Sequence, residues 1–203
     1  MIKRFALLAS LLALSFWVDG QTKNPIFVQY IDKYKSLAID QQRKHKVPAA
    51  ITIAQGLLES AAGTSELAQS SNNHFGIKCA SDWVGLTYTK DDDKKDECFR
   101  KYATPADSYE DHSLFLKRKR YASLFTLPIA DYKGWAYGLK ACGYATDPKY
   151  ADKLIKLIEL YELQNITLDT TLINAGLVSK KDTTWQNTQN NKILQDEQVG
   201  EEA

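Results

Sequence analysis

Apolar residues recur at helical spacing along most of this chain, and this pattern predicts a largely helical fold. We expect the helices at residues 25–46, 48–63, 65–70, 105–116, 131–142 and 148–163. Residues 76–102 differ, because aromatic and β-branched residues there flank a charged turn at residues 91–96. The predicted fold class is therefore α+β, mostly helical, with a small β-hairpin lobe between helices.

The predicted helix over residues 48–63 carries one acidic residue on an otherwise apolar segment. At about 100° per residue, Thr52, Gln55 and Glu59 share the more polar stripe. Glu59 lies in the last turn, where the negative end of the helix dipole and burial beside apolar neighbours both disfavour its charge. A protonated carboxyl is what a general acid for glycosidic cleavage requires. The alternative interpretation is a solvated glutamate at a helix end.

Five short motifs follow one another from this helix onward. They are Glu59–Ser65, Asn72–Lys78, Cys98–Tyr102, Ser108–His112 and Gly143–Ala151. Taken together and in this order, they resemble the glucosaminidase family of peptidoglycan hydrolases, over about residues 45 to 162. The resemblance implies a lysozyme-like fold of two lobes with a cleft between them. It also implies cleavage of the β-1,4 bond after N-acetylglucosamine in peptidoglycan glycan strands, an endo-β-N-acetylglucosaminidase activity, with Glu59 as general acid.

The second catalytic group is harder to identify. In the family, a second acidic residue lies on the β-lobe, and this sequence departs from the pattern by offering several: Asp91, Asp92, Asp93, Asp96 and Glu97. Counting forward from Gly85 favours Asp91 as catalytic and Asp92 next to it at the substrate. Alternatives are a solvated hairpin tip or direct attack by the sugar's acetamido group, so the stereochemistry stays open.

The same resemblance implies further residues that contact substrate. A tyrosine of the last motif reaches the cleavage site, and we favour Tyr144 as catalytic. The expected substrate-binding residues are Asn73, Phe75, Gly76, Trp83, Asp92, Asp147 and Tyr150. As alternatives, Asp147 caps the last helix and Trp83 belongs to the core. Arg100 and Tyr102 are expected to hold the β-lobe against the helices.

The first twenty residues have the features of a signal peptide. A basic start at Lys3 and Arg4 precedes an apolar run from Phe5 to Val18, which at 14 residues is shorter than the roughly 20 needed to span a bilayer. We expect export to the periplasm, the cell envelope or the medium, with no stable membrane anchor; an uncleaved anchor is the alternative. Without this segment, the 26 basic and 25 acidic residues become 24 of each. This balance argues against nucleic acid as a partner.

The cysteines and the remaining composition complete the predictions. Export makes a disulfide between Cys79 and Cys98 plausible, with Cys142 left as a small packed residue. No cysteine or histidine spacing indicates a metal site, and we expect no cofactor. Residues 21–165 are predicted to form one monomeric domain, followed by a polar, disordered tail over 166–203. Rival functions are a muramidase, a lytic transglycosylase or a non-catalytic wall-binding module.

Overall fold

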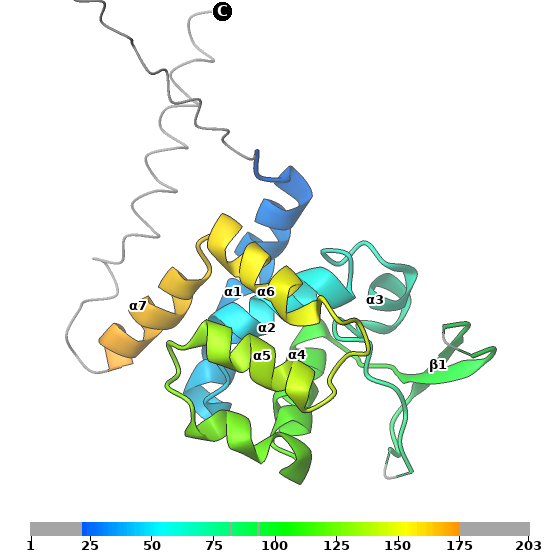
Figure 1. Ribbon diagram of the computed structural model, residues 1–203. Helices are drawn as coiled ribbons and strands as arrows, with labels where there is room; N and C mark the ends of the chain where they lie inside the picture. The colour runs from blue at the N-terminus through cyan, green and yellow to red at the C-terminus, as the bar shows by residue number, and fades with distance from the viewer. Residues whose placement is uncertain (1–21, 82, 93, 175–203) are drawn as a thin grey trace, which may run out of the picture.

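The computed structural model describes residues 22–81, 83–92 and 94–174. Within these residues the chain forms seven α-helices, one 3-10 helix and one antiparallel pair of strands (Figure 1). In order they are α1 (Pro25–His45), α2 (Ala49–Glu59), α3 (Glu66–Ser71), β1 (Thr87–Lys90), β2 (Glu97–Arg100), α4 (Pro105–Leu116), η1 (Lys119–Thr126), α5 (Tyr132–Ala141), α6 (Tyr150–Leu160) and α7 (Gln164–Asn174). The mostly helical α+β class predicted from the sequence is confirmed.

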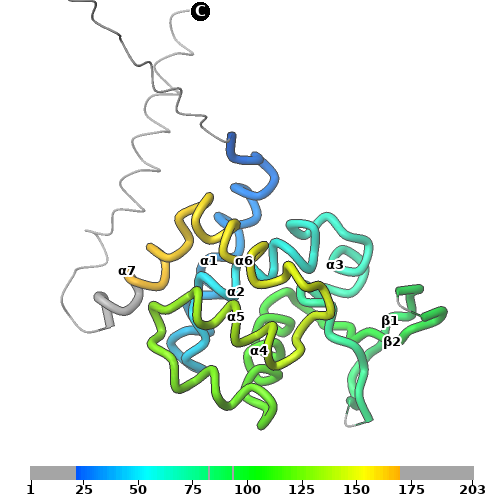
Figure 2. The backbone as a smooth tube through the Cα atoms, in the orientation of Figure 1, coloured from blue at the N-terminus to red at the C-terminus, as the bar shows by residue number. Residues whose placement is uncertain are grey.

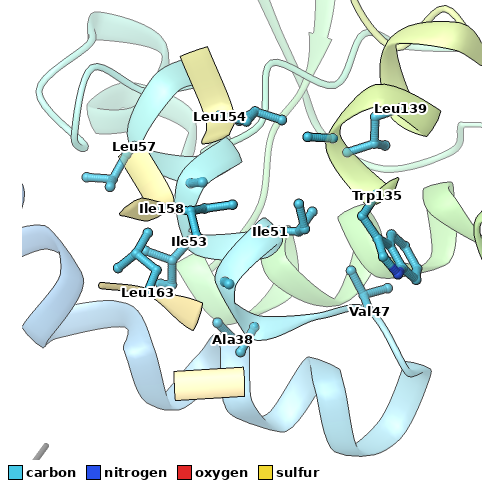
Figure 3. Close-up of a cluster of buried hydrophobic side chains, with 14 of the residues drawn as sticks. Ala38, Val47, Ile51, Ile53, Leu57, Trp135, Leu139, Leu154, Ile158 and Leu163 are labelled. Atoms are coloured by element: carbon cyan, nitrogen blue, oxygen red, sulfur yellow. The ribbon is translucent and has the colours of Figure 1, made fainter. Parts of the chain in front are cut away.

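Helix α2 lies at the centre of the fold because it is apolar on almost every side. All of its residues from 49 to 57 are buried, and it packs against α1, α5, α6 and α7. Large side chains from α5 and α6 surround it (Figure 3). The fully buried members of this core include Ile51, Ile53, Leu57, Trp135, Leu139, Leu154 and Ile158. The end of α2 is therefore fixed by the main hydrophobic core.

The first backbone N–H groups of α2 are satisfied by distant parts of the chain. The N–H of Ala49 donates to Gln42 Oε1 at 2.8 Å, and that of Ala50 donates to Thr167 Oγ1 at 2.9 Å. Buried helix ends need such partners. The sequence placed Pro48 in the first turn and Gly63 at the helix end, whereas Pro48 is the N-cap residue and the helix ends at Glu59.

Helix α7 corrects the predicted domain boundary. The prediction that the folded domain ends at residue 165 is wrong for residues 166–174, because α7 continues to Asn174 and buries Ile166 and Thr167 against α1 and α2. The polar composition of α7 gave no sign that it packs on the core. Thr167, for example, contacts α2 through its hydroxyl group, which accepts a backbone N–H. The rest of the predicted tail, residues 175–203, and the predicted signal peptide lie outside the described residues.

The two strands form a short hairpin that projects from the helices (Figure 2). Thr87 pairs with Arg100 and Lys90 with Glu97, so each strand has four residues. Trp83 and Tyr102, expected in strands, lie outside them, and the 3-10 helix η1 was not predicted. We call residues 76–102 the β-lobe. Among the described residues, no helix combines the length and the apolar character that a membrane crossing needs.

A disulfide closes the β-lobe internally, and side chains at its base hold it against the helices. The predicted disulfide between Cys79 and Cys98 is confirmed, with Cα atoms 5.4 Å apart. The predicted role of Arg100 and Tyr102 is confirmed too. Arg100 Nη1 lies 3.0 and 2.9 Å from the two carboxylate oxygens of Asp111 on α4, and Tyr102 Oη donates to Asp111 Oδ2 at 2.6 Å. One carboxylate therefore holds the base of the hairpin against the helices.

Candidate functional site

A pocket of about 600 Å³ lies between the helices and the β-lobe. Its helical wall comes from the ends of α2 and α4, the loop after α5, and the first turn of α6: Leu58, Glu59, Phe115, Arg118, Tyr144, Ala145, Thr146, Asp147, Tyr150 and Lys153. Its opposite wall comes from the β-lobe: Phe75 (just before it), Gly76, Ile77, Lys78, Cys79, Ala80 and Asp92. The predicted cleft between two lobes is therefore present, with Glu59 in its lining.

Glu59 is the last residue of α2 and is largely buried. Burial raises the pKa of its carboxyl group from 4.5 to about 7, and a hydrogen bond from Tyr150 partly opposes this rise by stabilising the carboxylate. The upward direction of the pKa predicted from the sequence is confirmed, with burial as the main cause. Near neutral pH, Glu59 can therefore hold a proton in a pocket open to a ligand.

Tyr150, in the first turn of α6, is the tyrosine that contacts Glu59. Its hydroxyl group donates to Glu59 Oε1 at 3.0 Å and accepts a hydrogen bond from Gln55 Nε2 at 2.9 Å. Burial raises the pKa of Tyr150 far above its usual value, so the phenol stays neutral. Tyr144, the tyrosine favoured from the sequence, instead stacks its ring on Tyr150 with centroids 5.7 Å apart and lines the pocket beside it.

The two candidate aspartates of the hairpin face different surroundings. Asp91 is exposed, and its Oδ1 accepts the backbone N–H of Asp96 at 2.8 Å, which closes the turn. Asp92 lines the pocket and forms an ion pair with Lys78 at 3.0 Å. The sequence favoured Asp91, but the pocket lining contains Asp92 and lacks Asp91. Asp93 lies outside the described residues.

Two other residues that were predicted to bind substrate, Asn73 and Trp83, form hydrogen bonds within the protein instead. Asn73 is buried, and its amide nitrogen donates to the carbonyl groups of Ile77 and Arg100, both at 2.9 Å. Trp83 donates from Nε1 to the Leu86 carbonyl at 3.0 Å, and the Arg100 guanidinium lies 4.6 Å from its ring centroid. Neither side chain belongs to the pocket lining formed by the described residues. Both instead shape the β-lobe.

Phe75, Gly76 and Asp147, which the sequence predicted to bind substrate, lie in the pocket lining. Gly76 has a φ of 61°, which glycine adopts without strain. Asp147 was also expected to cap the last helix, but the N-cap of α6 is Lys149. Its carboxylate instead accepts the N–H of Lys149 at 2.8 Å and binds Lys153 Nζ at 2.6 Å.

Several residues of the site had no predicted role: Gln55, Lys78, Phe115, Arg118 and Lys153. A signal for Gln55 was present, since it shares the polar stripe of α2 with Glu59. Tyr150 was predicted to bind substrate, and its burial also had a signal, because Tyr150, Ala151, Leu154 and Ile158 follow the buried face of α6. The positions of Lys78 and Arg118 depend on how the β-lobe and α4 meet, which no local pattern encodes.

The buried histidines belong to the core. Burial lowers the pKa of His74 to about 4 and that of His112 to about 3, so both rings are neutral at physiological pH. His112 stacks on Phe75 with centroids 3.9 Å apart. In the part of the chain that the structure describes, no group of three His, Cys, Asp or Glu residues could hold a metal ion.

Comparison with known proteins identifies similar chains. The model of the family Glucosaminidase, described as mannosyl-glycoprotein endo-beta-N-acetylglucosaminidase, matches residues 35–163. The chain is 36% identical over 165 residues to the exo-glucosaminidase LytG of Bacillus subtilis, covering 73% of this chain and 58% of LytG. It is 33% identical over 126 residues to the peptidoglycan hydrolase FlgJ of Salmonella typhimurium, covering 56% of this chain and 39% of FlgJ. The chain thus spans about half the length of these relatives.

Solved structures of similar fold cover most of the described domain. The catalytic domain of the autolysin Auto from Listeria monocytogenes has a TM-score of 0.59 at 28% identity, covering 71% of this chain and 89% of that domain. A peptidoglycan hydrolase from Sphingomonas sp. A1 has a TM-score of 0.60 at 29% identity, covering 70% and 94%. The glycoside hydrolase domain of Salmonella typhimurium FlgJ has a TM-score of 0.57 at 27% identity, covering 74% and 96%.

Proposed function

Because this chain belongs to the glucosaminidase family, we propose that it is a peptidoglycan hydrolase that cleaves the glycan backbone after N-acetylglucosamine. The observation that carries the proposal is the carboxyl group of Glu59 in the pocket lining, with a pKa raised to about 7 by burial. The relatives support the substrate, since FlgJ is a peptidoglycan hydrolase and LytG an exo-glucosaminidase.

Glu59 acts in this proposal as the general acid that protonates the leaving glycosidic oxygen. An acid of this kind must be protonated when substrate binds, and burial supplies that state near neutral pH. The cleavage rate should therefore fall as the pH rises through about 7, because the ionised carboxylate has no proton to donate. The neutral phenols of Tyr144 and Tyr150 lie beside it and can hydrogen-bond the sugar or a water molecule.

We assign the role of second catalytic group to Asp92 in place of Asp91, which the sequence favoured. Asp92 is the hairpin carboxylate in the pocket lining, whereas the Asp91 carboxylate closes the turn. Asp92 would stabilise the positive charge that develops on the sugar, or activate water, with Lys78 holding its carboxylate in place through their ion pair at 3.0 Å. Attack by the 2-acetamido group of the substrate is the alternative that needs no second carboxylate.

Rival activities on peptidoglycan differ in the glycosidic bond that is cleaved and in whether cleavage is internal or at chain ends. Lysozyme-like folds host muramidases and lytic transglycosylases as well, so the fold does not choose among them. The similarity to LytG also favours a second candidate, release of sugars from chain ends, because LytG is an exo-glucosaminidase. Large internal fragments early in digestion would indicate endo cleavage, and small fragments alone would indicate exo cleavage.

The test is digestion of purified peptidoglycan by residues 21–203 and by the Glu59→Gln variant. Products are reduced with borohydride and weighed by mass spectrometry. We expect new reduced N-acetylglucosamine ends with the unchanged chain, and at least about 100-fold fewer with the variant, within the range that a general acid contributes. Reduced muramic acid or 1,6-anhydro ends would identify a rival activity. Binding to the wall without new ends would indicate a non-catalytic wall-binding module.

The proposal extends to where the protein acts. Residues 1–20 would direct export, which brings the chain to peptidoglycan and to an oxidising compartment. The disulfide between Cys79 and Cys98 supports this location, because such bonds persist outside the cytosol. Secretion is tested by the mass of the mature chain, with cleavage expected before Gln21.

A further inference from the structure

Gln55 lies one helical turn before Glu59 and is fully buried. Its Nε2 lies 2.9 Å from the hydroxyl oxygen of Tyr150, and that hydroxyl group lies 3.0 Å from Glu59 Oε1. Two hydrogen bonds thus connect the three side chains. Gln55 and Glu59 belong to α2, and Tyr150 of α6 lies between them. Gln55 has no other partner for this nitrogen among the hydrogen bonds of the described residues.

The orientation of the Gln55 amide, with Nε2 toward Tyr150, sets the direction of both bonds. An amide nitrogen only donates, so the Tyr150 oxygen must accept from Gln55. The hydroxyl hydrogen of Tyr150 is then free to point only at the other neighbour, Glu59 Oε1. Because Oε1 accepts this hydrogen, the acidic proton of Glu59 resides on Oε2.

We propose that Gln55 is a positioning residue for the general acid, acting through Tyr150 to keep the proton of Glu59 on Oε2. The inference rests on the proposed role of Glu59 in glycan cleavage. Gln55 does not line the pocket and would not touch the substrate. Its donation makes the Tyr150 hydroxyl a stronger donor, since hydrogen bonds in a chain polarise one another. Gln55 therefore helps to set both the orientation and the acidity of Glu59.

Other groups face Glu59 from the elements around the pocket, and the Gln55→Met substitution leaves each of them unchanged. Its phenol neighbours are Tyr150 and Tyr144, and the charged side chains in the same lining are Lys78, Asp92, Arg118, Asp147 and Lys153. A change at Gln55 alters none of these charges. Any shift in the titration of Glu59 then reports on the hydrogen-bond chain.

The experiment replaces Gln55 by Met, which keeps the unbranched side chain and fills the same space without a donor. Thr52→Val is the matched control, because Thr52 is equally buried one turn earlier, and among the described residues its hydroxyl group bonds only the Pro48 carbonyl. The pKa of Glu59 is measured by NMR on protein labelled with ¹³C in the glutamate carboxyl groups, with the signal assigned by its loss in Glu59→Gln. This measurement requires no turnover, so it stands even if the proposed activity fails.

We expect Gln55→Met to raise the pKa of Glu59 by ~0.5–1 unit, because the carboxylate receives a weaker hydrogen bond. The alkaline limb of the activity profile should move up equally, with kcat/KM about 10-fold lower below pH 6, part of what a general acid supplies. In a Tyr150→Phe background, Gln55→Met should produce no further shift. An unchanged or lowered pKa in Gln55→Met, or an equal shift with and without Tyr150, would overturn the proposal. Loss of folding in Gln55→Met is excluded by a melting temperature close to that of Thr52→Val.

Discussion

The two walls of the pocket are held in different ways. The helical wall places Glu59 at the end of a helix that is buried from residue 49 to residue 57, beside α6, which packs on the same core. The β-lobe wall rests on two four-residue strands in which Phe99 and Arg100 are the buried residues, and the links that hold it include the Arg100–Asp111 ion pair and a disulfide within the lobe. An isolated pair of strands is marginally stable in water. The acid is therefore fixed by the core of the whole domain, and the opposite wall by a few separable links.

The strongest test of this difference removes the carboxylate at the base of the hairpin. Asp111→Ala deprives the buried Arg100 guanidinium, 5% exposed, of its ion pair. We expect a loss of about 3–5 kcal/mol in the free energy of unfolding, as for other broken buried pairs. Glu159→Ala is the control, because it breaks an exposed pair with Lys133 and should change stability by less than about 1 kcal/mol. Urea titration measures both, and equal losses would contradict the comparison.

The disulfide provides the second test. Replacing Cys79 and Cys98 together by Ser should lower stability by roughly 3 kcal/mol, because the bond closes a loop of about 20 residues in the unfolded chain. Hydrogen exchange should accelerate in the hairpin while the amides of α2 stay protected. Cys142→Ser is the control, since this cysteine is free and partly buried. Uniformly faster exchange in α2 and in the hairpin would show that the two walls unfold as one unit.

The third test concerns the helical wall and uses pH. Glu59 has a folded pKa of about 7 against 4.5 for the free group, so ionising it disfavours the folded state. Below pH 4.5 the carboxyl is protonated in both states and has no effect on stability. As the pH rises from 4.5 to about 7, the wild type should lose about 3 kcal/mol relative to Glu59→Gln, and the difference should then stay constant. Thermal unfolding of both proteins between pH 4 and 9 measures this, and parallel curves would disprove it.

The smallest effect separates the two hairpin aspartates. Asp92→Asn should lower kcat/KM on peptidoglycan about 10-fold, or ~1.4 kcal/mol in the barrier, since Asp92 lines the pocket. Asp91→Asn should lower it less than about 2-fold, because an Asn oxygen can still accept the Asp96 N–H. Equal effects would return the assignment to the hairpin as a whole. No effect from Asp92→Asn would favour the acetamido group of the substrate.

Local patterns predicted the parts of the molecule that local physics decides. The apolar spacing of residues 50–58 indicated a buried helix, and Glu59 at its end is where the pattern places it. Thr104 and Pro105 indicated the start of α4, which begins there with a capping box to Asp107. The cysteine pair was also readable from the sequence, because its members flank the hairpin.

The sequence did not predict the contacts between side chains of different helices and strands. Asp91 and Asp92 are neighbours with the same chemistry, and only the turn geometry decides which one closes the turn and which one faces the pocket. The contact of Tyr150 with Glu59 requires the packing of α6 on α2. Thr167 illustrates the same limit, because its partner lies 117 residues earlier in the chain.

The start of α1 and the end of α6 lie side by side. The N–H of Asn24 donates to the Tyr161 hydroxyl at 3.0 Å, and Lys23 pairs with Glu162 at 3.2 Å. The segment ahead of α1 therefore starts beside the end of α6, and α6 separates that corner from Tyr150 by about 16 Å. A module joined ahead of α1 would meet the domain at this corner, with the pocket left accessible.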